Sequence, residues 1–311
     1  MGKLLKFQGT LFSISAVFLF LSGIGCTNTP EDTSTREETT IGDENTEEAT
    51  DTIRLPDGVA SPVTIEGVVT KKNVTFTVYL PEGYNNGKQR YPVIYHLHGI
   101  GGAHDGNQKN LVPESFRAAK NKGLIDDVII VFPDGYKDSF WADSYTGDKP
   151  AETNLIKEII PFMDKHFRSI ADANHRFIQG FSMGGFGALK FFTKYPDMFA
   201  GVYIYDAALL QWNTIVTGHQ AVARDVFNND RALFESEYSP WTFAVQNQAE
   251  FKGKQRIGIA VGALVNYNEQ MHELLTGLDI PHSYTTTSCD HNIACLLQSA
   301  GEEAAAFFAG N

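Results

Sequence analysis

The chain has 311 residues, of which 42% are hydrophobic and 20% charged. This composition is typical of a folded protein with one large domain or two small ones. The formal net charge is −12, and the absence of a basic stripe that could neutralise phosphates argues against nucleic acid as a partner. The nine histidines show no spacing of the H-E-x-x-H kind, and no phosphate-binding loop is evident. We therefore expect no metal and no cofactor.

The N-terminus has the pattern of an export signal. Lys3 and Lys6 precede an apolar run, Leu11–Leu21, and small residues follow as far as Cys26. The apolar run is short for a membrane span but suits the core of a signal peptide. The segment ending in Cys26 resembles a bacterial lipoprotein cleavage site, although the third position before the cysteine is glycine. We expect residues 1–26 to be a signal peptide and Cys26 to be lipidated; an ordinary signal peptide cut nearby is the alternative.

The next segment is rich in Thr, Glu and Asp and has almost nothing to bury. Residues 27–56 are therefore expected to form a disordered acidic tether that holds a domain away from a membrane. An acidic interaction tail is the alternative. Residues 57–311 contain no internal repeat and are expected to form one domain. The protein is then exported and lipid-anchored to a bacterial membrane, or otherwise periplasmic or secreted.

The domain begins with an antiparallel hairpin and continues as alternating strands and helices. Short apolar or β-branched runs predict strands, and longer amphipathic runs between them predict helices. This alternation predicts an α/β fold with a mostly parallel sheet, helices on both faces and a site at the carboxyl ends of the strands. The expected hairpin strands are Val63–Thr70 and Val74–Leu80; the expected later strands are Pro92–Leu97, Val128–Phe132, Phe177–Gln179, Gly201–Tyr205, Ile257–Val261 and His282–Thr287; the expected helices are Pro113–Asn121, Glu152–Phe167, Met183–Tyr195, Asn268–Thr276 and Ile293–Phe308.

Residues 207–255 are less regular and contain Trp212 and Trp241. We expect a helix over Ala221–Leu233 within them. An insertion at this place in the fold could overhang the site and shape the substrate pocket.

A candidate nucleophile lies in Gly180-Phe-Ser-Met-Gly184, which fits G-x-S-x-G. A strand is expected before it and a helix after it, as this motif requires. A serine on such a tight turn needs small neighbours, because bulky side chains at 180 and 184 would clash with the backbone. The turn presents the Ser182 hydroxyl above a helix N-terminus, where the Met183 amide can stabilise negative charge.

A second turn, His98-Gly-Ile-Gly-Gly102, ends the expected strand Pro92–Leu97. Its glycines let the chain turn sharply and approach a substrate closely. Such a turn supplies the second backbone donor of an oxyanion hole, here the Ile100 amide.

The general base should come late in the chain, since this arrangement runs serine, acid, histidine. The histidines after Ser182 are His219, His272, His282 and His291. His291 alone is expected in a loop between the last strand and the last helix, so it is the predicted base.

Several segments resemble the esterase-D-type family, which includes feruloyl esterases, acetylxylan esterases, S-formylglutathione hydrolases and mycolyltransferases. The resemblance covers nearly all of residues 60–308, and Leu97–Gly102 is most similar to feruloyl esterase modules of bacterial xylanases. It implies an α/β-hydrolase fold, Ser182 and His291 as catalytic residues, and the Ile100 and Met183 amides as the oxyanion hole. The segments that carry it are Tyr79–Tyr84, Tyr91–Gly99, Ile159–Pro161, Gly180–Leu189 and Tyr195–Phe199.

The acid of the triad is not evident. Relatives usually place an aspartate shortly after Val261-Gly262, where this chain has Asn266 and Glu269 instead. Asn266 could hold the imidazole by a hydrogen bond, and Glu269 could reach it if the loop bends. Asp206, at the end of the strand after the nucleophile, is another suitable position.

Three further residues are candidates near the site. Cys289 and Cys295 are close enough to pair in an oxidising compartment and to stiffen the loop around His291; a metal site with His291 lacks an evident fourth ligand. Trp141 follows the fourth expected strand, where its ring could stack on a phenolic or sugar ring or lie in the core.

These features predict an exported serine carboxylesterase that acts on carboxylic esters through an acyl-enzyme on Ser182, with feruloyl or acetyl groups on polysaccharide as candidate substrates. One alternative is an acyltransferase that moves acyl groups to a surface glycan. A non-catalytic surface binding protein on a hydrolase scaffold is the other.

Overall fold

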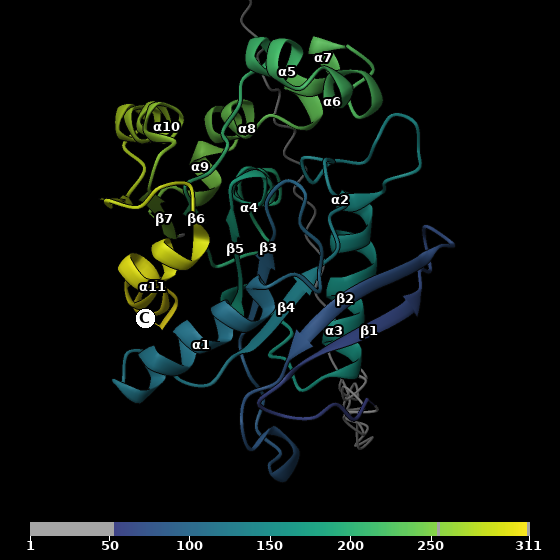
Figure 1. Cartoon of the computed structure of the whole chain (residues 1–311), viewed down its shortest axis with the longest axis vertical. Coiled ribbons are helices and arrows are strands. Elements are labelled where there is room, and N and C mark those ends of the chain that lie inside the picture. Colours follow the sequence, from purple (N-terminus) through teal and green to yellow (C-terminus); the bar gives the residue numbers. More distant parts are fainter. Residues whose placement is uncertain (1–52, 254–255, 310–311) are drawn as a thin grey trace, which may run out of the picture. The chain divides into compact units, whose positions relative to one another are not determined.

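A mixed sheet of eight strands organises residues 53–253 and 256–309, the part of the chain that the computed structural model describes (Figure 1). The strand order is β1-β2-β4-β3-β5-β6-β7-β8. The pairs β1–β2 and β2–β4 are antiparallel, and all the others are parallel. The strands are β1 Ala60–Glu66, β2 Asn73–Tyr79, β3 Val93–Leu97, β4 Ile129–Pro133, β5 Arg176–Phe181, β6 Gly201–Tyr205, β7 Arg256–Val261 and β8 His282–Thr286.

Helices cover both faces of this sheet (Figure 1). The α-helices are α1 Gln108–Asn121, α2 Ala151–Thr153, α3 Ile160–His166, α4 Met183–Lys194, α5 Trp212–Gly218, α6 Gln220–Asp225, α7 Arg231–Glu237, α8 Pro240–Gln246, α9 Gln248–Phe251, α10 Val265–Gly277 and α11 Ile293–Ala309. A π-helical segment, η2 Asn154–Ile159, joins α2 to α3, and 3-10 turns lie at η1 Tyr84–Asn86 and η3 Ala173–His175.

Two apolar cores form because alternate strand residues face opposite sides of the sheet. On β6, Val202 and Ile204 belong to the core beneath α3 and α4, whereas Tyr203 and Tyr205 belong to the core beneath α1 and α11. The mostly parallel sheet with helices on both faces is thus confirmed. Among the described residues, no helix combines the length and apolarity needed to cross a membrane.

The insertion differs from its prediction. The prediction of one helix over Ala221–Leu233 is wrong, because α6 ends at Asp225 and a separate helix, α7, starts at Arg231. Asn228 and Asn229 lie between them with φ of 55° and 52°, a left-handed backbone that cannot continue a right-handed helix. The Asp230 carboxylate then caps α7 by accepting hydrogen bonds from the Ala232 and Leu233 amides.

Two other helices have different bounds from those expected. Helix α1 starts at Gln108, five residues before Pro113, which lies inside it. The packing of Val112, Phe116 and Ala119 against the core outweighs the backbone hydrogen bond that the proline removes. The helix expected over Glu152–Phe167 consists of α2, η2 and α3 in succession.

The predicted signal peptide, the lipidated Cys26 and residues 27–52 of the predicted tether lie outside the described residues. Residues 53–56 are described. Ile53 and Leu55 pack against the core, and the Leu55 carbonyl accepts a hydrogen bond from Asn85. Contacts with the domain therefore begin ahead of the boundary expected at residue 57.

Candidate active site

Ser182 occupies the turn between β5 and α4 with φ of 57° and ψ of −117°, a strained backbone for a residue that is not glycine. A Cβ on Gly180 would lie 2.2 Å from the Gly184 oxygen, and one on Gly184 would lie 1.9 Å from the Leu97 oxygen. Only glycine fits at either position, which explains the spacing of the motif. The Ser182 amide donates to the Tyr205 carbonyl at 3.1 Å and ties the turn to β6.

His291 lies in the loop between β8 and α11. Its Nε2 is 2.8 Å from the Ser182 Oγ, and its ring packs on Phe181 with centroids 4.6 Å apart. Two of the other candidate bases pair with each other instead, since His272 Nδ1 lies 2.7 Å from His282 Nε2. His219 packs edge-on against Phe140. The structure therefore brings one of the four late histidines to the serine.

Asp206 is the carboxylate that contacts this histidine. Its Oδ2 accepts a hydrogen bond from His291 Nδ1 at 2.6 Å, and the side chain is fully buried. A carboxylate can only accept here, so Nδ1 carries the proton and the neutral ring presents Nε2 as the acceptor for the Ser182 hydroxyl.

Three backbone amides also converge on Asp206. Gly262, Ala263 and Leu264 donate to its oxygens at 2.8–3.2 Å. Burial acts to raise the pKa of Asp206, but the hydrogen bond from His291 and those from the Leu264 and Gly262 amides outweigh it, so the pKa lies below its ordinary value. The carboxylate is ionised at neutral pH and suited to stabilise an imidazolium.

The other two candidate acids are exposed on α10. The loop after β7 directs its amides at Asp206, and His291 Nδ1 bonds Asp206. Of the three candidates that the sequence leaves open, the structure therefore brings Asp206, and not Asn266 or Glu269, to this nitrogen. Sequence reasoning missed Asn268, which is fully buried and donates to the Ala207 and Leu264 carbonyls. It holds together the two turns that position the acid. Its place on the inner face of an amphipathic helix was the available signal.

The glycine turn after β3 approaches the serine closely. A Cβ on Gly99 would lie 3.2 Å from the Ser182 Cβ, which is tighter than an ordinary van der Waals contact, so glycine lets the two turns approach closely. The next residue, Ile100, is half exposed, and within the described residues its amide donates to no acceptor. The Met183 amide is the first of α4 and therefore has no intrahelical partner. Both amides remain available to an oxyanion.

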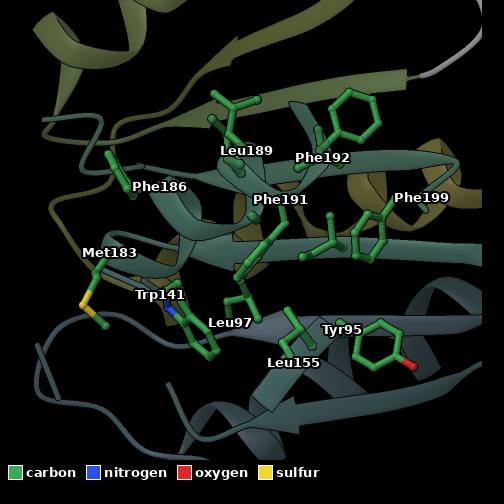
Figure 2. Packing of buried hydrophobic residues seen from close by; sticks show 14 of the residues in the cluster. Tyr95, Leu97, Trp141, Leu155, Met183, Phe186, Leu189, Phe191, Phe192 and Phe199 are labelled. Atoms are coloured by element: carbon green, nitrogen blue, oxygen red, sulfur yellow. The ribbon is translucent and has the colours of Figure 1, made fainter. Parts of the chain in front are cut away.

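Trp141 does not line the mouth of the site. Its side chain is fully buried, and Figure 2 shows it among the packed apolar side chains of the core. Of the two places that the sequence leaves open for Trp141, the structure therefore shows the core and not a position that could stack on a substrate ring. The loop after β4 turns inward because Gly135 and Gly187 leave space for the indole.

Cys289 and Cys295 are joined by a disulfide, and His291 lies inside the loop that this bond closes. Its sulfur atoms are therefore not free to bind a metal. Within residues 53–253 and 256–309, no group of three or more His, Cys, Asp or Glu side chains is arranged to hold a metal ion.

A serine on a strained strand-to-helix turn, linked through a histidine to a buried aspartate at the carboxyl ends of a parallel sheet, is the arrangement of serine hydrolases with the α/β-hydrolase fold. The family model described as "Putative esterase" matches residues 67–272. The chain belongs to this esterase family.

Among curated proteins, the chain is similar to Esterase Rv1288 of Mycobacterium tuberculosis, with 35% identity over 136 residues, which are 41% of this chain and 28% of that protein. It is equally similar to an endo-1,4-beta-xylanase/feruloyl esterase of Xylanibacter ruminicola, with 35% identity over 153 residues, 46% of this chain and 20% of that protein. The matches thus span less than a third of these relatives' own lengths.

Solved structures agree on the fold. A fluorophosphonate-binding serine hydrolase of Staphylococcus aureus, FphF, has a TM-score of 0.70 at 18% identity. The comparison covers 82% of this chain and 100% of that one. At this identity the likeness shows the α/β-hydrolase fold alone.

Proposed function

We propose that the protein is a serine carboxylesterase that works through an acyl-enzyme on Ser182. The observation that carries the proposal is the continuous line of hydrogen bonds from Asp206 to His291 at 2.6 Å and from His291 to Ser182 at 2.8 Å. Family membership supports the reaction class.

In acylation, His291 Nε2 removes the Ser182 hydroxyl proton while Oγ bonds to the ester carbonyl carbon. The carbonyl electron pair moves onto its oxygen, which the Ile100 and Met183 amides stabilise. When this intermediate collapses, the bond to the alcohol oxygen breaks and the alcohol takes the proton from His291. Water then repeats the sequence on the acyl-enzyme and releases the carboxylic acid. Asp206 keeps Nδ1 protonated throughout and stabilises the imidazolium.

For the substrate we propose carboxylic esters attached to polysaccharide, such as feruloyl or acetyl groups. The similarity to a protein named as a xylanase and feruloyl esterase supports this class. The class also fits the export that we propose below, because a polymer cannot enter the cell intact.

For the location we propose an exported, lipid-anchored protein. The lysines and apolar run before Cys26 support this proposal. The disulfide between Cys289 and Cys295 independently supports export, though not the lipid anchor, because such bonds persist in oxidising compartments and are rare in the cytosol.

The test is hydrolysis of p-nitrophenyl acetate and methyl ferulate by the full chain and by Ser182→Ala. We expect kcat to fall at least about a thousandfold in the variant, since the nucleophile is lost. Ser236→Ala, a change at an exposed serine of α7, is the matched control and should leave kcat unchanged. Equal turnover by wild type and Ser182→Ala would contradict the mechanism. The ratio of the two substrates tests whether the enzyme accepts an aromatic acid.

A further inference from the structure

The loop after β4, residues 135–141, binds the glycine turn that carries the Ile100 amide. The Gly135 amide donates to His98 Nε2 at 3.0 Å, and the Gly101 amide donates to the Lys137 carbonyl at 2.6 Å. The Trp141 indole Nε1 donates to the His98 carbonyl at 3.2 Å. Three hydrogen bonds thus connect this loop to the turn His98–Gly102.

Two of these bonds engage the backbone of the turn, at the His98 carbonyl and the Gly101 amide. The Gly99 carbonyl accepts hydrogen bonds from His98 Nδ1 at 2.9 Å and from the Gly102 amide at 3.0 Å. Within the described residues, the Ile100 amide is left without an acceptor. The contacts therefore hold the backbone on both sides of Ile100, at the His98 carbonyl and the Gly101 amide.

The loop is strained. Tyr136, Phe140 and Trp141 have φ of 57°, 51° and 58°, and each such residue costs free energy that surrounding contacts must offset. The Trp141 indole supplies part of that offset, since a Cβ added to Gly135 or to Gly187 of α4 would lie 2.5 Å from its ring. The indole fills the space that these two glycines leave.

A buried lysine holds the same tryptophan from the other side. Lys190 of α4 is fully buried, and its Nζ donates to the Trp141 carbonyl at 2.5 Å and to the Glu152 carboxylate at 2.7 Å. The Trp141 amide donates to the Ser139 Oγ at 2.8 Å, and this hydroxyl donates to the Gly135 carbonyl. The amide, the carbonyl and the indole N–H of Trp141 therefore each have a hydrogen-bond partner. A side chain that only filled space in the core would not need these bonds.

We infer that Trp141 is a positioning residue for the oxyanion hole: it holds the glycine turn through the His98 carbonyl so that the Ile100 amide points at the developing oxyanion. This inference rests on the proposed esterase reaction. In this inference α4 contributes to the oxyanion hole in two ways. It begins with the Met183 amide, and its residues Gly187 and Lys190 hold Trp141 in place.

The test compares Trp141→Phe with Trp241→Phe. Both changes remove one indole hydrogen bond to a backbone carbonyl, but Trp241 donates to the Leu209 carbonyl in the insertion at 3.3 Å. Each variant is assayed for kcat and KM on p-nitrophenyl acetate, for inhibition by a trifluoromethyl ketone whose adduct fills the oxyanion hole, and for Tm.

For Trp141→Phe we expect kcat to fall about tenfold with KM within twofold, because a displaced donor costs less than a deleted one. The inhibition constant of the ketone should rise by a similar factor, while Trp241→Phe stays within twofold of wild type. Full activity of Trp141→Phe, equal losses in both variants, or a lowered Tm with unchanged ketone affinity would overturn the inference. Failure of the wild type to hydrolyse the ester would instead overturn the proposed function.

Ser139→Ala provides a second variant in case Trp141→Phe does not fold. It keeps the indole but frees the Trp141 amide and the Gly135 carbonyl. We expect a loss of ketone affinity in the same direction and smaller, with KM again unchanged. Unaltered ketone affinity in this variant would overturn the inference.

Discussion

Ser182 and Asp206 both have positive φ, of 57° and 42°. Each follows a strand of the parallel sheet, β5 and β6, at the point where the chain must turn away from it. Strain of this kind persists only where neighbouring contacts determine the backbone. Here the Ser182 amide donates a hydrogen bond to the Tyr205 carbonyl, and the Asp206 amide donates one to the Ala260 carbonyl at 2.7 Å. The sheet therefore fixes the positions of both residues.

Asp206→Asn should reduce kcat on p-nitrophenyl acetate about a thousandfold or more, because an amide no longer enforces the Nδ1-protonated imidazole or stabilises the imidazolium. Steady-state kinetics on the purified variant measure the loss. Glu269→Gln is the matched control, since it makes the same chemical change on exposed α10 and should retain full activity. If Glu269→Gln lost as much activity as Asp206→Asn, the assignment of the acid would be wrong.

At the scale of elements, a buried ion cluster joins α2 to α4. Glu152 of α2 accepts hydrogen bonds from Lys190 at 2.7 Å and Lys194 at 2.8 Å, and from the Tyr195 hydroxyl. Burial acts to raise the pKa of Glu152, but the two lysines outweigh it, so the pKa lies below its ordinary value. The cluster ties the first turn of one helix to the last turns of another.

Because the folded-state pKa of Glu152 is depressed, its contribution to stability is present above the unfolded value of about 4.3 and is lost as pH falls through the folded value. Glu152→Gln leaves Lys190 buried with a weaker partner. The free energy of unfolding at pH 7 should therefore fall by about 3–5 kcal/mol, and the difference from wild type should shrink near pH 3. Urea unfolding at both pH values measures it.

The control for this cluster is Glu235→Gln, which breaks an exposed ion pair with Arg231 at 2.7 Å. Exposed pairs contribute little, so the loss should stay below about 1 kcal/mol at either pH. A Glu152→Gln protein whose stability deficit did not change with pH would show that the carboxylate is not ionised in the folded state.

The disulfide between Cys289 and Cys295 is the second feature that stabilises the arrangement of elements. Its two cysteines are separated by six positions in the sequence, and the loop between them carries His291. Closing a loop this short stabilises the fold by about 2 kcal/mol in the chain-entropy model. Replacing both cysteines by serine should lower the free energy of unfolding by about that amount and reduce kcat, since the base is less constrained. Urea unfolding and ester hydrolysis check both effects; unchanged kcat would mean that β8 and α11 alone position His291.

At the scale of the whole molecule, the domain is expected to act at a membrane surface. The evidence is sequence pattern before residue 53, together with the disulfide in the domain. A lipid anchor would hold the enzyme near the cell that uses its products, and an acidic tether would extend it toward a polymer.

Expression of the full chain in a bacterium that processes lipoproteins tests this expectation. Wild type should partition into the detergent phase of a Triton X-114 extraction, and Cys26→Ser should move to the aqueous phase, because a diacyl anchor is lost. Wild type in the aqueous phase would favour the ordinary signal peptide instead. Neither result of this extraction bears on whether the domain hydrolyses esters, which a separate activity assay measures.

The motif around Ser182 could be predicted from the sequence because the turn itself requires small residues. Gly180 is required by a contact four residues away, and Gly184 by a contact with the end of the neighbouring strand β3. His291 could be predicted because the order of elements places it after the last strand. The parallel strands could be predicted for a different reason: a strand that is buried on both faces is a nearly continuous apolar run. The sequence by itself therefore determined the mostly parallel sheet, and it predicted the serine and the histidine that the fold brings into contact.

Tertiary structure alone decided the acid and the place of Trp141. Asp206 meets His291 because β6 lies beside β7 in the sheet, so the loop after β7 directs its amides at the end of β6. No local pattern distinguishes that aspartate from Asn266 or Glu269. Trp141 turns inward because Gly135 of its own loop and Gly187 of the distant helix α4 leave space for its ring. Periodicity and sterics act over a few residues, whereas a hydrogen-bond partner or a packing space depends on which distant segments the fold brings together.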